Sequence, residues 1–135
     1  MSFGFYLKLY SATLAAFLAI DMLWLGFIAR KLYRDQLGFL LSPQANWAAA
    51  ILFYLLFVFG VLFFVVLPGL EAGSLKATFL RAALFGLLTY ATYDLTNLAT
   101  IKNWPLSITL IDMAWGVVLT SLVAWISFLV GQKIA

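Results

Sequence analysis

Four apolar runs, each long enough to cross a lipid bilayer as a helix, dominate this sequence. A helix rises 1.5 Å per residue, so about 20 apolar residues span a hydrocarbon core about 30 Å thick. Only 10% of the 135 residues are charged, whereas about a quarter are charged in a typical water-soluble domain. We therefore expect an all-α integral membrane protein folded as a four-helix up-down bundle. The expected spans, which form a single transmembrane domain over residues 1–135, are residues 5–28, 46–67, 75–101 and 106–130.

Polar or turn-forming segments separate these spans. Residues 30–46 form the longest connection, and their mixture of charges and leucines is typical of a short helix at the membrane surface. Pro68, Gly69 and Gly73 predict a tight turn after the second span, and Ser74 is placed to cap the third. The second span has no charge and no polar stripe, so we expect it to be the most lipid-exposed.

The composition excludes several kinds of chemistry. The chain has no cysteine and no histidine, which removes disulfides, structural zinc sites, imidazole ligands to haem and Ser-His-Asp triads. The net charge of +3 comes from scattered cations, a pattern that fits anchors flanking membrane spans and not a surface for nucleic acid. We assign no metal site, and the sequence leaves any cofactor unknown. Without cysteine or histidine, any chemistry of the side chains must use carboxylates, hydroxyls, amides, amines or indole rings.

Three aspartates lie inside the apolar runs, where an ionisable side chain costs roughly 2.5 to 3.5 kcal/mol and is a candidate for function. Asp21 and Asp94 each lie about seven residues before the end of a span, and Asp112 lies about six after the start of one. In an up-down bundle these three ends lie on the same side. The rise per residue then places all three carboxylates about 10 Å below one surface, and we expect them to face one another.

Aromatic and amide side chains accompany these aspartates. In the first and fourth spans a tryptophan follows the aspartate by three residues, which places both on one helix face. No Lys or Arg is expected at this depth, so the carboxylates would have no internal counter-ion. The candidate ligand-binding residues are Asp21, Trp24, Tyr90, Tyr93, Asp94, Asn97, Asp112 and Trp115.

Small residues recur on the same faces as the polar ones. Gly86, Tyr90 and Asp94 are spaced by four, as are Asp112 and Gly116, and small residues at this spacing allow helices to approach closely in lipid. The third and fourth spans should therefore pack tightly together. Other tryptophans, at span ends or far from the aspartates, are typical of the aromatic belts at membrane surfaces: Trp47, Trp104 and Trp125.

Three sequence blocks also resemble a known family. They are YDLTN at residues 93–97 with Trp-Pro at 104–105, and Asp-x-x-Trp at residues 21–24 and 112–115. The chain resembles, over essentially its whole length, a family of small bacterial predicted membrane proteins classified only as a domain of unknown function. This resemblance implies a multi-pass protein with four spans in the bacterial cytoplasmic (inner) membrane. It implies no activity, so no catalytic role is carried over to any residue.

Buried carboxylates without a counter-ion need a partner, and a proton, a hard metal ion or an organic cation held against aromatic rings would each suit. Our leading hypothesis is an inner-membrane protein that binds a small cationic, protonatable or lipid-derived ligand at the aspartate layer. A small carrier of this kind would require homo-oligomerisation to enclose a pathway. One alternative is a membrane enzyme that modifies lipids with its aspartates. Another is an accessory subunit of a larger membrane complex.

Overall fold

All regular structure in this protein is helical, as predicted, and the computed structural model describes all 135 residues. Five helices follow one another, and no strand is present. Two of the helices contain a π-helical segment, which lies at the end of the first and inside the third. The bounds are α1 (Phe3–Leu23) with π-helical Trp24–Ile28, α2 (Arg30–Leu37), α3 (Trp47–Val61) with π-helical Leu62–Val66 and α4 (Leu67–Ala72), α5 (Leu75–Thr100) and α6 (Leu106–Ile134).

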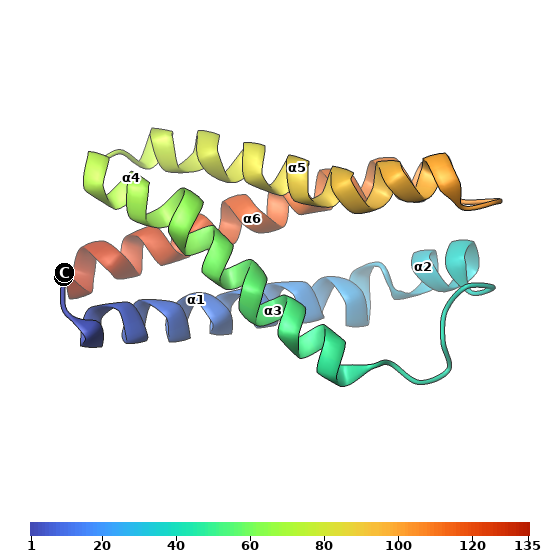
Figure 1. Cartoon of the computed structure of the whole chain (residues 1–135), viewed down its shortest axis with the longest axis horizontal. Helices are drawn as coiled ribbons and strands as arrows, with labels where there is room; N and C mark the ends of the chain where they lie inside the picture. The colour runs from blue at the N-terminus through green and yellow to red at the C-terminus, as the bar shows by residue number, and fades with distance from the viewer.

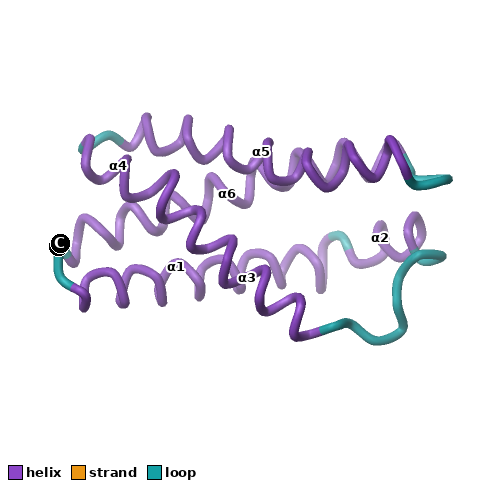
Figure 2. Tube along the Cα trace, in the orientation of Figure 1, coloured by secondary structure: helices purple, strands orange, loops and turns teal.

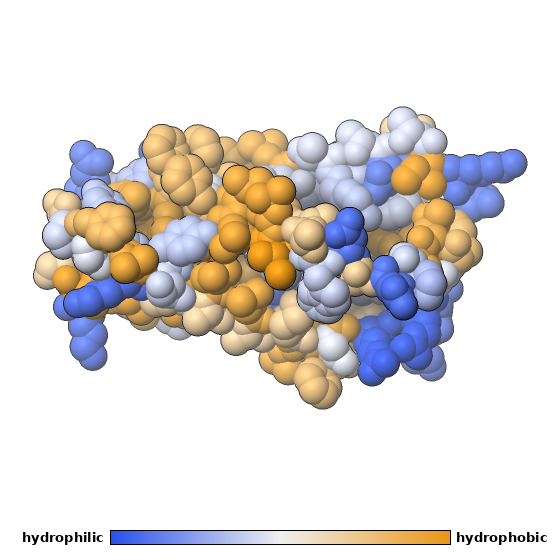
Figure 3. Space-filling model, turned by 60° about the horizontal axis from the view of Figure 1, so that its bottom comes forward, coloured by the Kyte–Doolittle hydropathy of each residue, from blue (hydrophilic) through white to orange (hydrophobic).

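Successive long helices run in opposite directions between the two ends of the molecule, and α3 crosses α1 obliquely (Figure 1). The short helix α2 lies at one end, where residues 38–46 form the longest loop (Figure 2). Three helices are long and apolar enough to cross a membrane: Phe3–Ile28, Trp47–Ala72 and Leu106–Ile134. Hydrophobic residues cover the middle of the molecule, and hydrophilic residues gather at its ends (Figure 3).

The second long helix does not end where the sequence predicted. It continues through Pro68 and Gly69 and ends at Gly73, whose φ of 62° is the left-handed conformation that glycine tolerates. Proline is accommodated because it lies just after a π-helical segment, where the regular α-helical hydrogen-bond pattern is already interrupted. Pro68 cannot donate to the turn before it, and the Phe64 carbonyl, four residues earlier, accepts a hydrogen bond of 3.3 Å from Arg81 Nη1. The predicted turn at Pro68 and Gly69 is therefore wrong.

The starts of the long helices follow the local sequence. Ser74 caps α5 as predicted, since its hydroxyl accepts a 3.0 Å hydrogen bond from the Ala77 amide. Asn46 caps α3 in the same way, through a 3.1 Å bond from Ala49. Both residue types are preferred at this position because their side chains satisfy amides that have no partner within the helix.

The core forms along one stripe of α1. The buried residues of this helix are Phe5, Leu9, Thr13, Phe17 and Asp21, which are spaced by four and so share one face. Midway along the stripe, the Thr13 hydroxyl is 2.7 Å from that of Ser127 on α6, a buried hydrogen bond between the two helices.

The rod formed by α3 and α4 packs against this stripe. It contributes much of the main hydrophobic cluster, so it is not the most lipid-exposed helix, and that expectation is wrong. An all-apolar sequence cannot show which face of a helix is buried, because every face is suited to both lipid and core. The residues that this rod contributes to the hydrophobic cluster are Phe57, Val58, Val61, Leu62, Val65 and Val66.

Helices α5 and α6 lie in close contact where each has a glycine. A Cβ built on Gly86 would overlap the carbonyl oxygen of Gly116 and lie 2.8 Å from Thr120 Oγ1. A Cβ built on Gly116 would overlap the ring of Tyr90. The predicted tight packing of these two helices is therefore confirmed.

Replacement of either glycine by alanine should destabilise the protein, because backbone or a packed ring must shift to make room. We expect Gly86→Ala and Gly116→Ala each to cost about 1 to 3 kcal/mol, measured as a lower midpoint of thermal unfolding in detergent. Gly26→Ala is the matched control, since a Cβ there meets nothing within 4 Å. Equal midpoints for all three variants would contradict the close approach.

Candidate functional site

A cavity of about 390 Å³ lies between α2 and the adjoining ends of α5 and α6. Two of the three candidate aspartates, Asp94 and Asp112, line it together. Asp94 reaches it from the last turns of α5, and Asp112 from the second turn of α6. The full lining consists of Leu25, Arg30, Tyr33, Arg34, Leu37, Leu41, Tyr93, Asp94, Trp104, Ile108 and Asp112.

Asp94 is the most unusual side chain of this cavity. Its residue is 0% exposed, and neither of its carboxylate oxygens has a hydrogen-bond partner. The neighbouring Asp112 is also a carboxyl group, so it could donate to Asp94 only when it carries a proton. A buried carboxylate without a donor is costly, and Asp94 therefore requires a proton or a donor from outside the chain.

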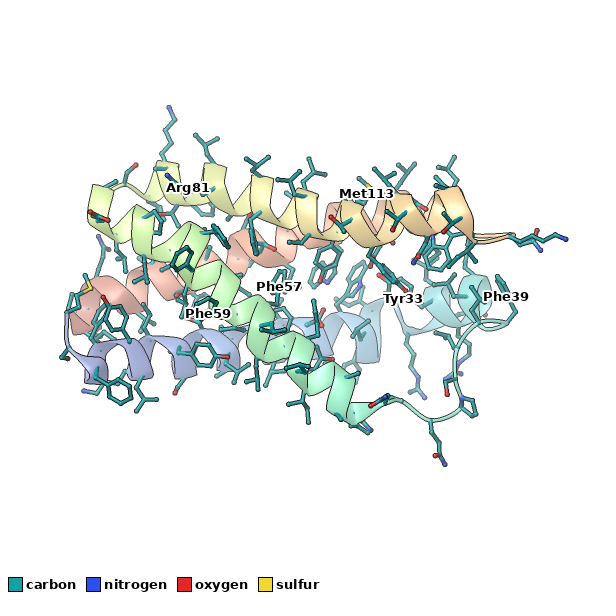
Figure 4. All side chains as sticks on the ribbon, in the orientation of Figure 1. Tyr33, Phe39, Phe57, Phe59, Arg81 and Met113 are labelled. Atoms are coloured by element: carbon teal, nitrogen blue, oxygen red, sulfur yellow. The ribbon has the colours of Figure 1, made fainter.

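Asp112 is held by Tyr33, which is not among the candidate residues predicted from the sequence. The Tyr33 hydroxyl lies 2.7 Å from Asp112 Oδ1, and the indole nitrogen of Trp24 donates to the same hydroxyl at 3.1 Å. An indole N–H can only donate, so the Tyr33 oxygen accepts from Trp24 and directs its own proton to Asp112. Tyr33, labelled in Figure 4, extends from α2 toward α5 and α6.

Asp21 occupies a separate position. It is 6% exposed and accepts a hydrogen bond of 3.2 Å from the indole nitrogen of Trp115. Trp115 in turn stacks on Trp24, with ring centroids 4.4 Å apart and planes 8° from parallel. Asp21 does not line the cavity, and no three acidic groups lie together as metal ligands would. The structure therefore brings Asp94 and Asp112 together and leaves Asp21 behind the tryptophan pair.

The other candidates from α5 lie around this pair. Tyr93 lines the cavity, and its ring meets that of Trp104 edge-on at 5.8 Å between centroids. Tyr90 lies one turn deeper, against Gly116 and outside this cavity. Asn97 is half-buried one turn nearer the helix end, and it does not line the cavity either.

Two cations border the cavity from its exposed end, above the depth of the carboxylates. Arg30 and Arg34 of α2 line the cavity while remaining exposed. Counting depth along the long helices could not place these arginines at the cavity, because Ala29, with φ of −107° and ψ of 2°, ends the first helix and turns the chain into α2. A signal was present in the sequence: residues 30, 33, 34, 37 and 41 all line the cavity and recur at helical spacing.

Trp104 also departs from expectation. It is 8% exposed and packs with Leu37 and Ile108, so it is a cavity residue and not part of a surface belt. Its indole nitrogen donates to the Thr109 hydroxyl at 3.1 Å. The residue before it, Asn103, has a φ of 63°, a left-handed conformation that asparagine adopts more readily than most residues. This turn directs the chain back so that Trp104 closes one side of the cavity.

Comparison with known proteins supports the membrane assignment. Residues 6–129 match a family described as predicted membrane protein (DUF2177). The chain belongs to the DUF2177 family. No curated protein and no solved structure matches it. Residues 24, 33, 94, 104 and 112, which build the cavity and its hydrogen bonds, all lie within the matched part of this DUF2177 chain.

Removal of the Tyr33 hydroxyl should loosen this end of the protein. Tyr33→Phe leaves Asp112 without its donor and Trp24 without its acceptor, so we expect a loss of about 1 to 3 kcal/mol in unfolding free energy. Thermal unfolding in detergent measures it, with Tyr6→Phe, at an exposed tyrosine on α1, as the control. An unchanged midpoint would show that the bond contributes nothing to stability.

The unfolding free energy that the Tyr33 hydroxyl contributes should also depend on pH. Burial and the Asp112 carboxylate raise the pKa of Tyr33 above its usual value of 10.0. The unfolded chain therefore loses this proton first, and the stability that Tyr33 provides is complete below about pH 10 and declines above it. The difference in unfolding free energy between wild type and Tyr33→Phe should thus be constant around neutral pH and decrease above about pH 10. A difference that grows with pH would contradict this assignment.

Proposed function

We propose that this DUF2177 protein crosses the bacterial inner membrane four times and binds a small ligand in the cavity at Asp94 and Asp112. The fourth span would be α5, whose 26 residues are long enough to cross. Its close packing on α6 at Gly86 supports this, because helices approach in this way where small residues meet in lipid. Its polar residue Asp94 is turned into the bundle and away from hydrocarbon.

The unpartnered carboxylate of Asp94 carries the proposal that a ligand binds. A residue needed only to hold α5 on α6 would be expected to make a hydrogen bond, and Asp94 makes none. A ligand with an ammonium, hydroxyl or other protonated group would provide the missing donor. This is the chemistry of a small cationic, protonatable or lipid-derived molecule, and a carrier for such a molecule is one form the function could take.

Binding can be followed with the protein's own fluorescence, because Trp104 lines the cavity. We expect titration with butylammonium or with 1-monooleoylglycerol, two probes that each carry a donor, to change the emission. Asp94→Asn should weaken that response at least about tenfold, since hydrogen bonds to charged groups contribute roughly 1.5 to 3 kcal/mol.

Asp35→Asn is the matched control for this experiment. Asp35 is an exposed acidic residue on α2 that does not line the cavity, so its replacement should leave the titration unchanged. The binding proposal fails if neither probe alters the emission of the wild type. It also fails if Asp94→Asn and Asp35→Asn behave alike.

One observation favours a second function, a membrane enzyme that modifies lipids. Asp94 and Asp112 are neighbouring carboxyl groups in unlike surroundings, since Asp112 accepts a hydrogen bond from Tyr33 and Asp94 accepts none. Such an asymmetric pair is what a general acid and a general base require. Incubation of the purified protein with membrane lipids, followed by mass spectrometry of the extract, would reveal a covalent product that Asp94→Asn does not form.

A further inference from the structure

A second cavity adjoins the first on its deeper side. It has a volume of about 310 Å³ and is lined by Phe53, Phe57, Thr89, Tyr90, Tyr93 and Asp112. Tyr93 and Asp112 line both cavities, so these two side chains stand where one meets the other. The rings of Phe53 and Phe57 come from α3, and the second cavity is therefore formed between α3 and α5.

The two cavities present three kinds of surface in order of depth. Arg30 and Arg34 are exposed at the end of the molecule and share one face of α2, because they are four residues apart. Asp94 lies six residues before the end of α5, which corresponds to about 9 Å below that end. Tyr90 lies one turn, or about 6 Å, deeper still. From the surface inward, the order is guanidinium groups, carboxyl groups and aromatic rings.

Each surface suits one part of an amphipathic molecule. Guanidinium groups bind phosphate through paired hydrogen bonds. A buried carboxylate with no partner suits a hydroxyl or other donor. The aromatic cavity suits a hydrocarbon chain, which packs against the rings through van der Waals contacts. A membrane phospholipid presents phosphate, backbone and chain in this same order of depth.

We propose that the ligand is a single-chain phospholipid with a free hydroxyl beside its chain, a lysophospholipid. This rests on the proposed function, since it names the ligand of the same site. The phosphate would bind Arg30 and Arg34, the free hydroxyl would donate to Asp94, and the acyl chain would enter the cavity at Phe53 and Phe57. A diacyl phospholipid is disfavoured, because its esterified backbone offers only acceptors to Asp94.

Four probes separate these contributions in a binding titration with the protein in detergent. They are 1-oleoylglycerol 3-phosphate, the corresponding phosphatidic acid, 1-monooleoylglycerol and glycerol 3-phosphate, read by tryptophan fluorescence and by native mass spectrometry. The first has phosphate, free hydroxyl and chain, whereas the second lacks the hydroxyl, the third the phosphate and the fourth the chain. We expect the first to bind at least tenfold more tightly than each of the others.

Variants of α2 test the phosphate contact. Joint replacement of Arg30→Gln and Arg34→Gln should weaken binding of 1-oleoylglycerol 3-phosphate at least tenfold and leave 1-monooleoylglycerol unchanged. Lys31→Gln is the matched control, because Lys31 is an exposed cation on the same helix that does not line the cavity. Circular dichroism and the unfolding midpoint of each variant confirm that it is folded.

Other results would overturn this inference in distinguishable ways. If 1-monooleoylglycerol binds as tightly as 1-oleoylglycerol 3-phosphate, or if the arginine replacements have no effect, the protein has no phosphate site. The proposed function still stands in that case if binding of 1-monooleoylglycerol depends on Asp94. Equal binding of phosphatidic acid removes the role of the hydroxyl. Equal binding of glycerol 3-phosphate would assign the site to a water-soluble phosphate. If none of these four probes binds in an Asp94-dependent way, this inference fails, and the proposed function then stands only if butylammonium binds and requires Asp94.

Discussion

The close approach of α5 to α6 is the constraint on which the rest of the site depends. Two glycines without Cβ atoms, Gly86 and Gly116, allow one backbone to lie against the other. Tyr90 then covers Gly116, and one turn further along α5 Asp94 lies beside Asp112. The close packing at Gly86 and Gly116 thus determines where the two carboxyl groups meet, although neither glycine is part of the cavity.

A second constraint comes from α2, which closes the cavity that this packing leaves open. The π-helical segment at the end of α1 and the turn at Ala29 bring α2 back over the ends of α5 and α6. Once there, Tyr33 bonds to Asp112 and the two arginines reach the same cavity. Segments with π-helical geometry are frequent at functional sites, and here the segment begins at Trp24, whose indole orients Tyr33.

The sequence predicted much of this architecture. Apolar periodicity and length predicted helices throughout, and the spacing of glycines with Tyr90 and Asp94 predicted the contact between α5 and α6. These signals are reliable because they are local, depending only on helical geometry and residue size. The residues 93–97 and the two Asp-x-x-Trp blocks also identified the family. The same helical geometry brought Asp94 and Asp112 to one depth.

What could not be predicted depends on long-range packing. Counting residues along each helix placed Asp21 at the depth of the other aspartates, but it cannot show in which direction around the helix axis a side chain points. In the structure Asp21 accepts a hydrogen bond from Trp115 and does not line the cavity. The continuation of the second long helix through Pro68 depends on a π-helical segment that has no sequence signature in an all-apolar run. Tyr33 was overlooked because a surface helix was expected, while the face that it turns toward the bundle was not considered.

The stacked pair of Trp24 and Trp115 has a consequence beyond packing. Two indole rings that lie 4.4 Å apart and almost parallel are close enough for their ultraviolet transitions to couple, which changes their circular dichroism relative to two separated indoles. Because one ring comes from the end of the first helix and the other from the last helix, this coupling exists only while those two segments are docked. The protein therefore carries a built-in optical marker of whether its first and last helices are assembled.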